Sequence, residues 1–544
     1  MKKKILFIIF SFLFIFLTSC NILIYNSSGT TTSKSDIRVY NYKNSTKPIT
    51  LYGRDFSVTY DSSKADTYKN KGEAVKSAME EGKKKYSDIA KLYEDFVDGY
   101  YYLYDEYCYQ GIIADTTAKD KDYDLQDEIY ALILDIEVID QEIDIAASKS
   151  KYRNSYFEGW TDAEIDEYIE SLDPEATKVE NDIETKMKEA LSSYYGGETS
   201  GFDALKLYVS YANELAKLKD YDDYLEYAYE NVYSREYSVE DTNNLKTYID
   251  NTIIPLNEEA LKNFLDFKDT SSRSDYNSFL NLYSNFYAYY LDYFDSYANK
   301  LGGDYLKSYK TYFESGNYFY SSNENDNVTA YVGNFADGTP YMFMGPDNQS
   351  SSTFIHEFGH YNATLTGGDS GSYDLAETQS QGNELLYYLY LKSSDIAKNT
   401  VINAYLNYQI YSMTDSVISG FLINEMEKEI YQNDISNITE SDLYDIWDKL
   451  CDENNLSDYK DYNDWMLQVL LNYQGYYISY ATSAIASLEL YASALNNYDE
   501  ALEKYKIIYR KHSSGSTFTS ILEDAGLYSV FDKNTYDLIN TIVK

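Results

Sequence analysis

His356, Glu357 and His360 stand in the segment HEFGH, which follows the pattern HExxH. On a helix, side chains four residues apart project from one face about one turn apart, so both imidazoles can meet one metal ion. Zinc suits such a pair because it accepts nitrogen ligands without a strong angular preference. Glu357 lies between the two ligands, where its carboxylate can accept a proton from a metal-activated water. The segment therefore predicts a zinc site with Glu357 as general base.

A third ligand follows in the segment DLAETQSQGNE at residues 374–384, which is expected to form a second helix after a glycine-rich turn. Three protein ligands and one open position are typical of catalytic zinc sites, and Glu377 is the candidate here. The chain has only three histidines, and two of them, His356 and His360, fall in the motif. The third, His512, lies in the loop-like segment KHSSG and is expected to be solvated. We expect His356, His360 and Glu377 to bind one Zn²⁺ per chain.

These segments resemble the thimet oligopeptidase and oligoendopeptidase F family of zinc metallopeptidases, and they are most similar to its oligoendopeptidase F branch. Further similar blocks are GTPYMFM at 338–344, YQGYYISYAT at 473–482 and a glycine-containing tail at 509–527. The resemblance implies the same zinc ligands and the same base as the motif spacing does. It covers about 330–527, while the preceding part matches only as a helical lobe of suitable length.

The resemblance also implies that Tyr476 and Tyr480 stabilise the oxyanion through their hydroxyl groups. The family usually places a histidine a few residues before this tyrosine pair. This chain instead has Leu470, Leu471 and Asn472 there. The departure concerns substrate positioning and rate, not the metal ligands.

Two further roles concern the surroundings of the metal. Glu384 matches a recurrent acid of the family, and it is either a partner that orients a ligand histidine or an ordinary helix acid. The segment at 341–344 resembles the strand beside the substrate backbone. Its main-chain groups are expected to pair with an extended peptide by strand addition.

The implied function is that of a zinc-dependent oligoendopeptidase, which hydrolyses peptide bonds in short peptides by means of metal-activated water. The implied fold is mainly α, with two helical lobes enclosing a deep channel and a small β-sheet beside a gluzincin-like HExxH site. Two alternatives remain open. One is a peptide-binding lipoprotein with little or no catalytic activity, and the other is an adhesive surface protein whose helical lobe binds a partner.

The elements that must position these residues can be read from the rest of the chain. Only five prolines occur, which favours long helices. Apolar residues recur at spacings of three and four between 125 and 143, which predicts an amphipathic helix. Asp173-Pro174 is typical of a helix N-terminus. Two β-prone runs flank Gly338 between about 328 and 346, and they predict a hairpin just before the metal motif.

The N-terminus has lysines followed by an uncharged apolar run and then Leu-Thr-Ser-Cys. This pattern predicts a lipoprotein signal peptide at 1–19 and a lipidated Cys20, which would hold the protein on the extracytoplasmic face of the cell membrane. Residues 20–50 are expected to form a flexible tether. We divide the remainder into an N-terminal helical lobe at 51–325 and a catalytic lobe at 326–544.

The formal charge of −43 opposes binding to nucleic acid or to anionic lipid, so membrane contact is expected through the lipid alone. Apolar residues make up 44% of the chain, which is enough to fill a core. After lipidation of Cys20, Cys108 and Cys451 remain, either as a disulfide or as buried thiols. The sequence gives no indication of the oligomeric state.

Overall fold

The computed structural model describes residues 50–51, 54–55, 60–116, 123–284, 291–315, 318–320, 330–345, 350–368, 372–433, 435–513 and 515–542. The predicted signal peptide, Cys20 and almost all of the tether lie outside these residues, as does the predicted boundary at 325. No helix in the described part of the chain has the length and apolarity needed to cross a membrane.

The elements up to residue 270 are β1 (Thr50–Leu51), β2 (Arg54–Asp55), α1 (Ala65–Glu81), α2 (Tyr86–Thr116), α3 (Asp124–Lys149), α4 (Arg153–Tyr156), α5 (Asp162–Glu170), α6 (Pro174–Tyr195), α7 (Gly201–Leu218), α8 (Tyr224–Tyr227), α9 (Leu245–Tyr248) and α10 (Ile254–Thr270). The next elements are α11 (Arg273–Ser284), α13 (Leu291–Leu301), α14 (Gly303–Ser315), β3 (Tyr318–Tyr320), β4 (Tyr331–Asn334) and β5 (Pro340–Met344). The last elements are α15 (Ser351–Thr366), α16 (Tyr373–Leu391), α17 (Asn399–Tyr431), α18 (Glu440–Glu453), α19 (Asn463–Asn472), α20 (Tyr477–Asn496), α21 (Tyr498–Ile508), α22 (Phe518–Asp524) and α23 (Lys533–Ile539). The prediction of a mainly helical fold with a small sheet is confirmed.

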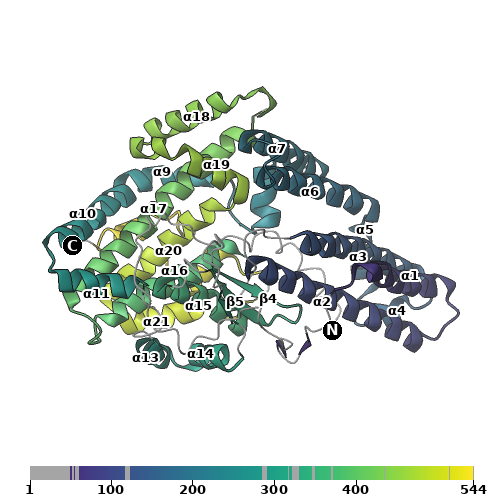
Figure 1. The fold of residues 1–544 in the computed structure, drawn as a ribbon. Helices are drawn as coiled ribbons and strands as arrows, with labels where there is room; N and C mark the ends of the chain where they lie inside the picture. Colours follow the sequence, from purple (N-terminus) through teal and green to yellow (C-terminus); the bar gives the residue numbers. More distant parts are fainter. Residues whose placement is uncertain are drawn as a thin grey trace.

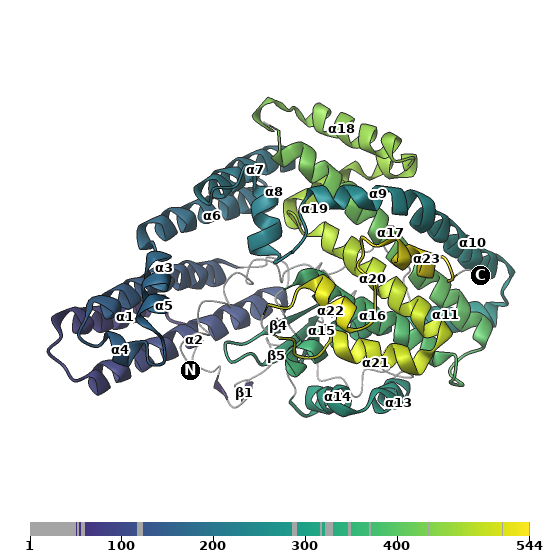
Figure 2. The same ribbon diagram turned by 180° about the vertical axis from the view of Figure 1, so that it is seen from behind.

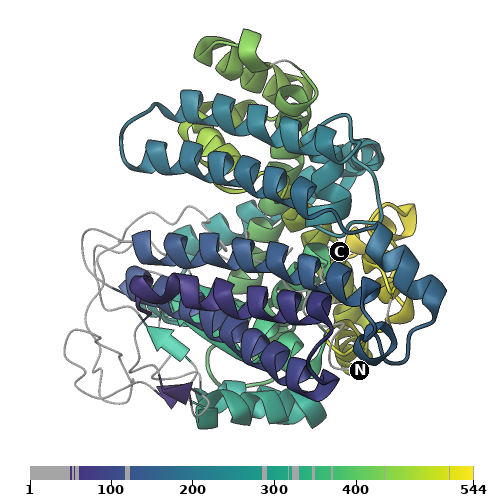
Figure 3. The same cartoon turned by 90° about the vertical axis from the view of Figure 1, so that its right-hand side faces the viewer.

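Helices α1 to α5 form one side of the molecule, at the right of Figure 1. The predicted apolar stripe lies on α3, where Ile129, Ile136 and Ile143 are buried against α1 and α2. The predicted start of α6 is also confirmed, because the Asp173 carboxylate caps it by accepting from the backbone N–H of Ala176 at 3.0 Å. In Figure 3, the pair α6–α7 lies between these helices and α18.

A larger apolar core fills the other side, where α16, α17 and α20 pack together (Figure 2). It includes buried residues from Ile183 to Ile539, so it draws on segments far apart in the sequence. Gly420 allows α17 and α20 to approach closely, because a Cβ there would lie 2.6 Å from the Tyr477 carbonyl oxygen. The helices that carry the site are therefore held inside the main core.

The predicted hairpin is confirmed as β4 and β5, which pair antiparallel with Tyr331 opposite Phe343. Gly338 in the turn has φ +79°, a conformation that favours glycine. However, β3 also pairs with β5, in parallel, so the strand order is β3-β5-β4. The expectation that 341–344 pair with a peptide is therefore wrong, since both edges of β5 are already occupied. Among the described strands, β4 and β3 are the edges.

The hairpin also joins the two sides of the molecule, because it lies between α15 and α2 (Figures 1 and 2). Asp105 on α2 accepts a hydrogen bond from the Ala336 backbone N–H at 2.8 Å. The Cys108 thiol lies 3.5 Å from the Asn334 carbonyl oxygen. Cys108 and Cys451 are both buried free thiols, so the alternative of a disulfide between them is excluded.

Candidate metal centre

Helix α15 carries the HEFGH motif, and it begins five residues before His356. The capping hydroxyl is that of Ser350, which accepts from the Thr353 backbone N–H at 3.1 Å. The next two serines contact other elements: Ser351 donates to the Leu282 carbonyl oxygen, and Ser352 donates to Glu384.

The structure brings His356, His360 and Glu377 together, although no pairing between α15 and α16 is evident locally in the sequence. Their ligand atoms all lie within 4.8 Å of one another. Glu377 Oε2 is 3.4 Å from His356 Nε2 and 3.8 Å from His360 Nε2. Ligands of a tetrahedral zinc ion, each about 2.0–2.1 Å from the metal, lie roughly 3.3 Å apart. The three side chains therefore fit a small ion without a change of fold.

The protonation states also fit a metal. Burial lowers the pKa of His360 to about 4, so its imidazole is neutral near pH 7. Burial alone would raise the pKa of Glu377, but contacts with His356, His360 and Tyr476 outweigh it and lower this pKa to about 2. A neutral imidazole and an ionised carboxylate are the forms that bind metal.

Glu384 lies on α16 beside His356, as one of its two predicted roles requires. Its Oε1 is 2.8 Å from His356 Nδ1, and its Oε2 accepts from the Ser352 hydroxyl at 3.0 Å. A proton on Nδ1 would leave the lone pair of Nε2 directed toward Glu377. Gln409 extends this chain from α17, since its amide donates to Ser352 Oγ at 3.3 Å. Sequence reasoning did not find Ser352 or Gln409.

Tyr476, directly before α20, reaches the cluster, and Tyr480 lies one helical turn farther on. The Tyr476 hydroxyl donates to Glu377 Oε1 at 2.6 Å, which is a contact with a candidate ligand. The rings of Tyr476 and Tyr480 lie 5.0 Å apart, and both residues are buried. Glu357 is also buried, on α15 between the two histidines. Five of the six predicted site residues thus lie on α15, α16 and α20, and Tyr476 directly precedes α20.

The two remaining sequence features, the stretch at 470–472 and His512, have other contacts. Leu470 and Leu471 are buried in the main core on α19, and the Asn472 amide donates to the Gln468 carbonyl oxygen. No side chain in that stretch replaces the missing imidazole. The His512 ring is partly buried and lies 3.3 Å from the Ile508 carbonyl oxygen in its own segment.

The positions of α15 and α16 depend on polar side chains that are buried on α16. The Asn383 amide donates to the Ile355 carbonyl oxygen at 2.8 Å. The Gln379 amide donates to the carbonyl oxygens of Gly368 and Ile508. The only hint in the sequence is that this helix is rich in Gln, Ser and Asn beside a metal motif.

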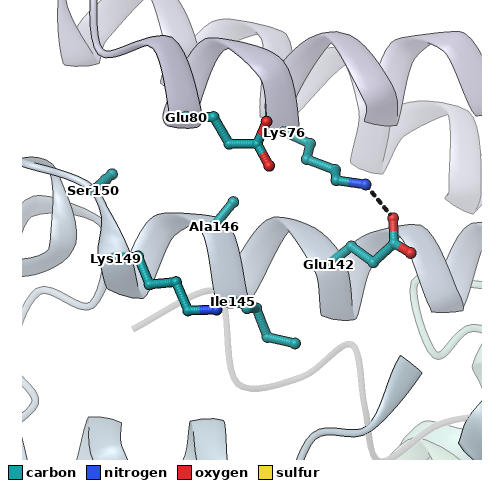
Figure 4. A pocket seen from close by; sticks show the side chains of 7 residues that line it. All are labelled: Lys76, Glu80, Glu142, Ile145, Ala146, Lys149 and Ser150. Atoms are coloured by element: carbon teal, nitrogen blue, oxygen red, sulfur yellow. Dashed lines mark hydrogen bonds and ion pairs between the residues drawn. The ribbon is translucent and has the colours of Figure 1, made fainter. Parts of the chain in front are cut away.

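A pocket elsewhere, between α1 and α3, holds none of the predicted site residues (Figure 4). An ion pair between Lys76 and Glu142 lies on it, with Lys149 and Glu80 nearby. Both charges of the ion pair are satisfied, so this pocket presents no ligand set for a metal.

Three solved structures share the fold. One is named as an oligoendopeptidase F from Bacillus anthracis strain Ames, with a TM-score of 0.62 at 14% identity over 91% of this chain and 98% of that one. Another is PZ peptidase A with an inhibitor, with a TM-score of 0.62 at 14% identity over 89% and 99% of the two chains. A further protein named as oligoendopeptidase F has a TM-score of 0.63 at 12% identity over 89% and 96%. The sequence itself matches no protein-family model and no curated protein. The chain therefore has the fold of oligoendopeptidase F and related peptidases.

Proposed function

We propose that this chain is a zinc-dependent oligoendopeptidase that hydrolyses peptide bonds in short peptides. The observation that carries the proposal is the cluster of His356, His360 and Glu377, in a fold whose solved relatives are named as peptidases. A peptide-binding protein has no need of two imidazoles and a carboxylate within 4.8 Å of one another.

His356, His360 and Glu377 would hold the ion. Bound zinc supplies Lewis acidity, which makes water a stronger acid and polarises a carbonyl group. The Glu357 carboxylate accepts a proton from the attacking water and returns it to the departing amine nitrogen. The Tyr480 hydroxyl donates to the developing oxyanion, while the Tyr476 hydroxyl holds Glu377.

The substrate backbone would add to an edge of the three-stranded sheet. Since β5 is the central strand, the candidate edges are those of β3 and β4. Recognition through main-chain hydrogen bonds reads an extended shape more than side chains.

The experiment that tests the proposal uses Glu357→Gln, which keeps the shape of the side chain but removes the base. We expect the purified wild type to contain one zinc per chain and to cut a quenched fluorogenic peptide. The Glu357→Gln variant should keep the zinc and lose nearly all turnover. The matched control is Glu453→Gln, an exposed acid on α18, which should retain both.

Two other outcomes would contradict the proposal. A zinc-free wild type that binds peptides without cutting them would support the alternative of a peptide-binding protein, to which the leucines at 470 and 471 give some weight. Full turnover of Glu357→Gln with metal intact would remove Glu357 as the base.

We also propose attachment to the outer face of the cell membrane through lipid on Cys20. The support is the sequence pattern around this cysteine alone. Expression of the full chain with a labelled fatty acid should label the wild type and not Cys20→Ala. Equal labelling of both would refute the anchor.

A further inference from the structure

Arg235 is a buried cation that the proposed chemistry does not use. It lies between α8 and α9, and its side chain has 0% exposure. Its Nη1 donates to the Gly475 carbonyl oxygen at 2.8 Å, and its Nη2 donates to the Ser479 hydroxyl at 2.7 Å. Both acceptors flank Tyr476 in the sequence. The guanidinium thus binds the turn and first residues of the helix that present the Tyr476 hydroxyl.

The same guanidinium also contacts the helix that carries Glu377. Arg235 Nε is 3.6 Å from Asp374 Oδ1, and Asp374 lies one turn before Glu377 on α16. The other oxygen of Asp374 accepts from the Tyr237 hydroxyl at 2.8 Å. Arg235 therefore links α16, which carries Glu377, to the turn and helix start that carry Tyr476. These are the two elements joined by the hydrogen bond between Tyr476 and Glu377.

The turn before α20 is fixed from other directions as well. The Glu427 carboxylate accepts from the Gly475 backbone N–H, and the Tyr233 hydroxyl donates to the Gln474 carbonyl oxygen. Gly475 has φ +74°, and a Cβ there would lie 3.0 Å from the Tyr233 ring. The rings of Tyr229 and Tyr233 flank the guanidinium carbon, with centroids at 4.3 and 4.4 Å.

Such an arrangement is costly for stability alone. Removing a cation from water carries a desolvation penalty, which the Asp374 carboxylate, the two hydrogen-bond acceptors and the two rings must offset here. Apolar side chains would fill this space at a lower cost in free energy. A guanidinium, in contrast, donates several hydrogen bonds in one plane and so fixes the positions of its acceptors. The arrangement thus favours a role in geometry.

We propose that Arg235 is a positioning residue, which holds the Tyr476 hydroxyl against the Glu377 carboxylate and so presets the third ligand of the metal centre. This inference rests on the proposed zinc site. It implies that loss of Arg235 weakens zinc binding through Tyr476 and not through a general loss of fold.

A double-mutant cycle tests this implication. The zinc dissociation constant would be measured by chelator competition for the wild type, Arg235→Lys, Tyr476→Phe and the double variant. Each single change should weaken zinc binding about tenfold. The double variant should also lose only about tenfold, because both changes remove the same constraint. The control Arg153→Lys alters an arginine paired with Asp166 in the N-terminal helices, and it should leave zinc affinity unchanged.

If Arg235→Lys does not fold, as judged by its thermal transition, Ser479→Ala takes its place in the cycle. That change removes one contact of the guanidinium and leaves the charge paired with Asp374. It should weaken zinc binding two- to fivefold, and not at all in the Tyr476→Phe background. Independent losses that multiply, or an unchanged zinc affinity in folded variants, would overturn the inference. A wild type that binds no zinc would overturn the proposed function as well.

Discussion

At the scale of single residues, the two oxygens of Glu377 have separate partners. Oε2 faces the two imidazoles, while Oε1 accepts from Tyr476. The two tyrosines, which the resemblance assigns to one role, therefore differ in their contacts: Tyr476 donates to Glu377, and the Tyr480 ring packs against the Tyr476 ring. Tyr476 already donates to the candidate ligand Glu377, and we therefore propose Tyr480 as the donor to an oxyanion.

This difference predicts opposite results for two conservative variants. Tyr480→Phe should lower kcat by about 10²–10³, the usual effect of removing one donor to a developing charge, and leave zinc affinity unchanged. Tyr476→Phe should weaken zinc binding about tenfold, because the carboxylate loses the bond that orients it. Zinc titrations and steady-state kinetics on the same preparations distinguish the two. Equal effects of both variants on zinc affinity would contradict the assignment.

Glu384 should behave as the partner of His356 and not as an ordinary helix acid. Glu384→Ala is expected to weaken zinc binding 10- to 100-fold, since the imidazole loses the acceptor at 2.8 Å that fixes its ring and its tautomer. Glu384→Gln keeps an acceptor and should lose less. Chelator competition measures both variants. Wild-type zinc affinity in Glu384→Ala would assign the ordinary role.

At the scale of helices, the metal centre depends on the close approach of α15 and α16. A Cβ at Gly359 would lie 2.6 Å from the Ser380 Cα and 2.7 Å from the Gln379 carbonyl oxygen, both of them backbone atoms. Backbone cannot move aside as a flexible side chain can. The glycine inside HEFGH therefore sets the distance between the histidine helix and the helix of Glu377.

Gly359→Ala should accordingly separate the two helices. We expect a loss of about 2–3 kcal/mol of stability and a large loss of zinc affinity, because overpacking moves Glu377 away from the imidazoles. The control is Gly382→Ala on α16, where a new Cβ would meet only side chains, the nearest at 3.2 Å. That variant should keep both properties. Thermal unfolding and zinc titration provide the readouts, and equal behaviour of both variants would contradict the packing argument.

Local signals predicted the helix starts and the hairpin well. Asp173-Pro174 predicts the start of α6 because capping involves only neighbouring residues. Gly338 predicts the hairpin turn because positive φ favours glycine. The pairing of β3 with β5 had no such signal, since parallel strands need a long connection and β3 has only three residues.

Within the site, the sequence predicted the candidate metal ligands that the structure brings together, but not the residues that position them. The four-residue spacing of His356 and His360 places both side chains on one face of a single helix, so their proximity can be predicted from the sequence. The contacts of Arg235 join segments about 240 residues apart in sequence, from Arg235 to Gly475. Such contacts follow only from the three-dimensional packing of the helices, and no local pattern encodes them.

At the scale of the whole molecule, buried acids lie in the core of a strongly acidic chain. Burial raises the pKa of Glu427 to about 8 and that of Glu489 to about 7. Glu427 accepts from the Gly475 N–H, and Glu489 accepts from the Tyr528 N–H at 2.9 Å. The folded protein therefore holds protons that the unfolded chain, with acids near their ordinary pKa, releases.

Because the folded protein binds more protons than the unfolded chain, acids such as Glu427 should make it less stable as pH rises. Its folded pKa of about 8 lies above the ordinary value of 4.5, so its contribution is fully present below pH 4.5 and is lost as pH rises toward 8. Glu427→Gln keeps the acceptor for Gly475 and cannot ionise. In zinc-free protein, the stability of Glu427→Gln relative to the wild type should therefore increase between pH 6 and 8, by at most about 1.4 kcal/mol per pH unit.

Urea unfolding at several pH values measures this difference in stability. The exposed acid variant Glu453→Gln is the control, and its stability relative to the wild type should not change with pH. A difference between Glu427→Gln and wild type that does not change with pH would mean that Glu427 is ionised in the fold, and that Arg235 has a second charged partner.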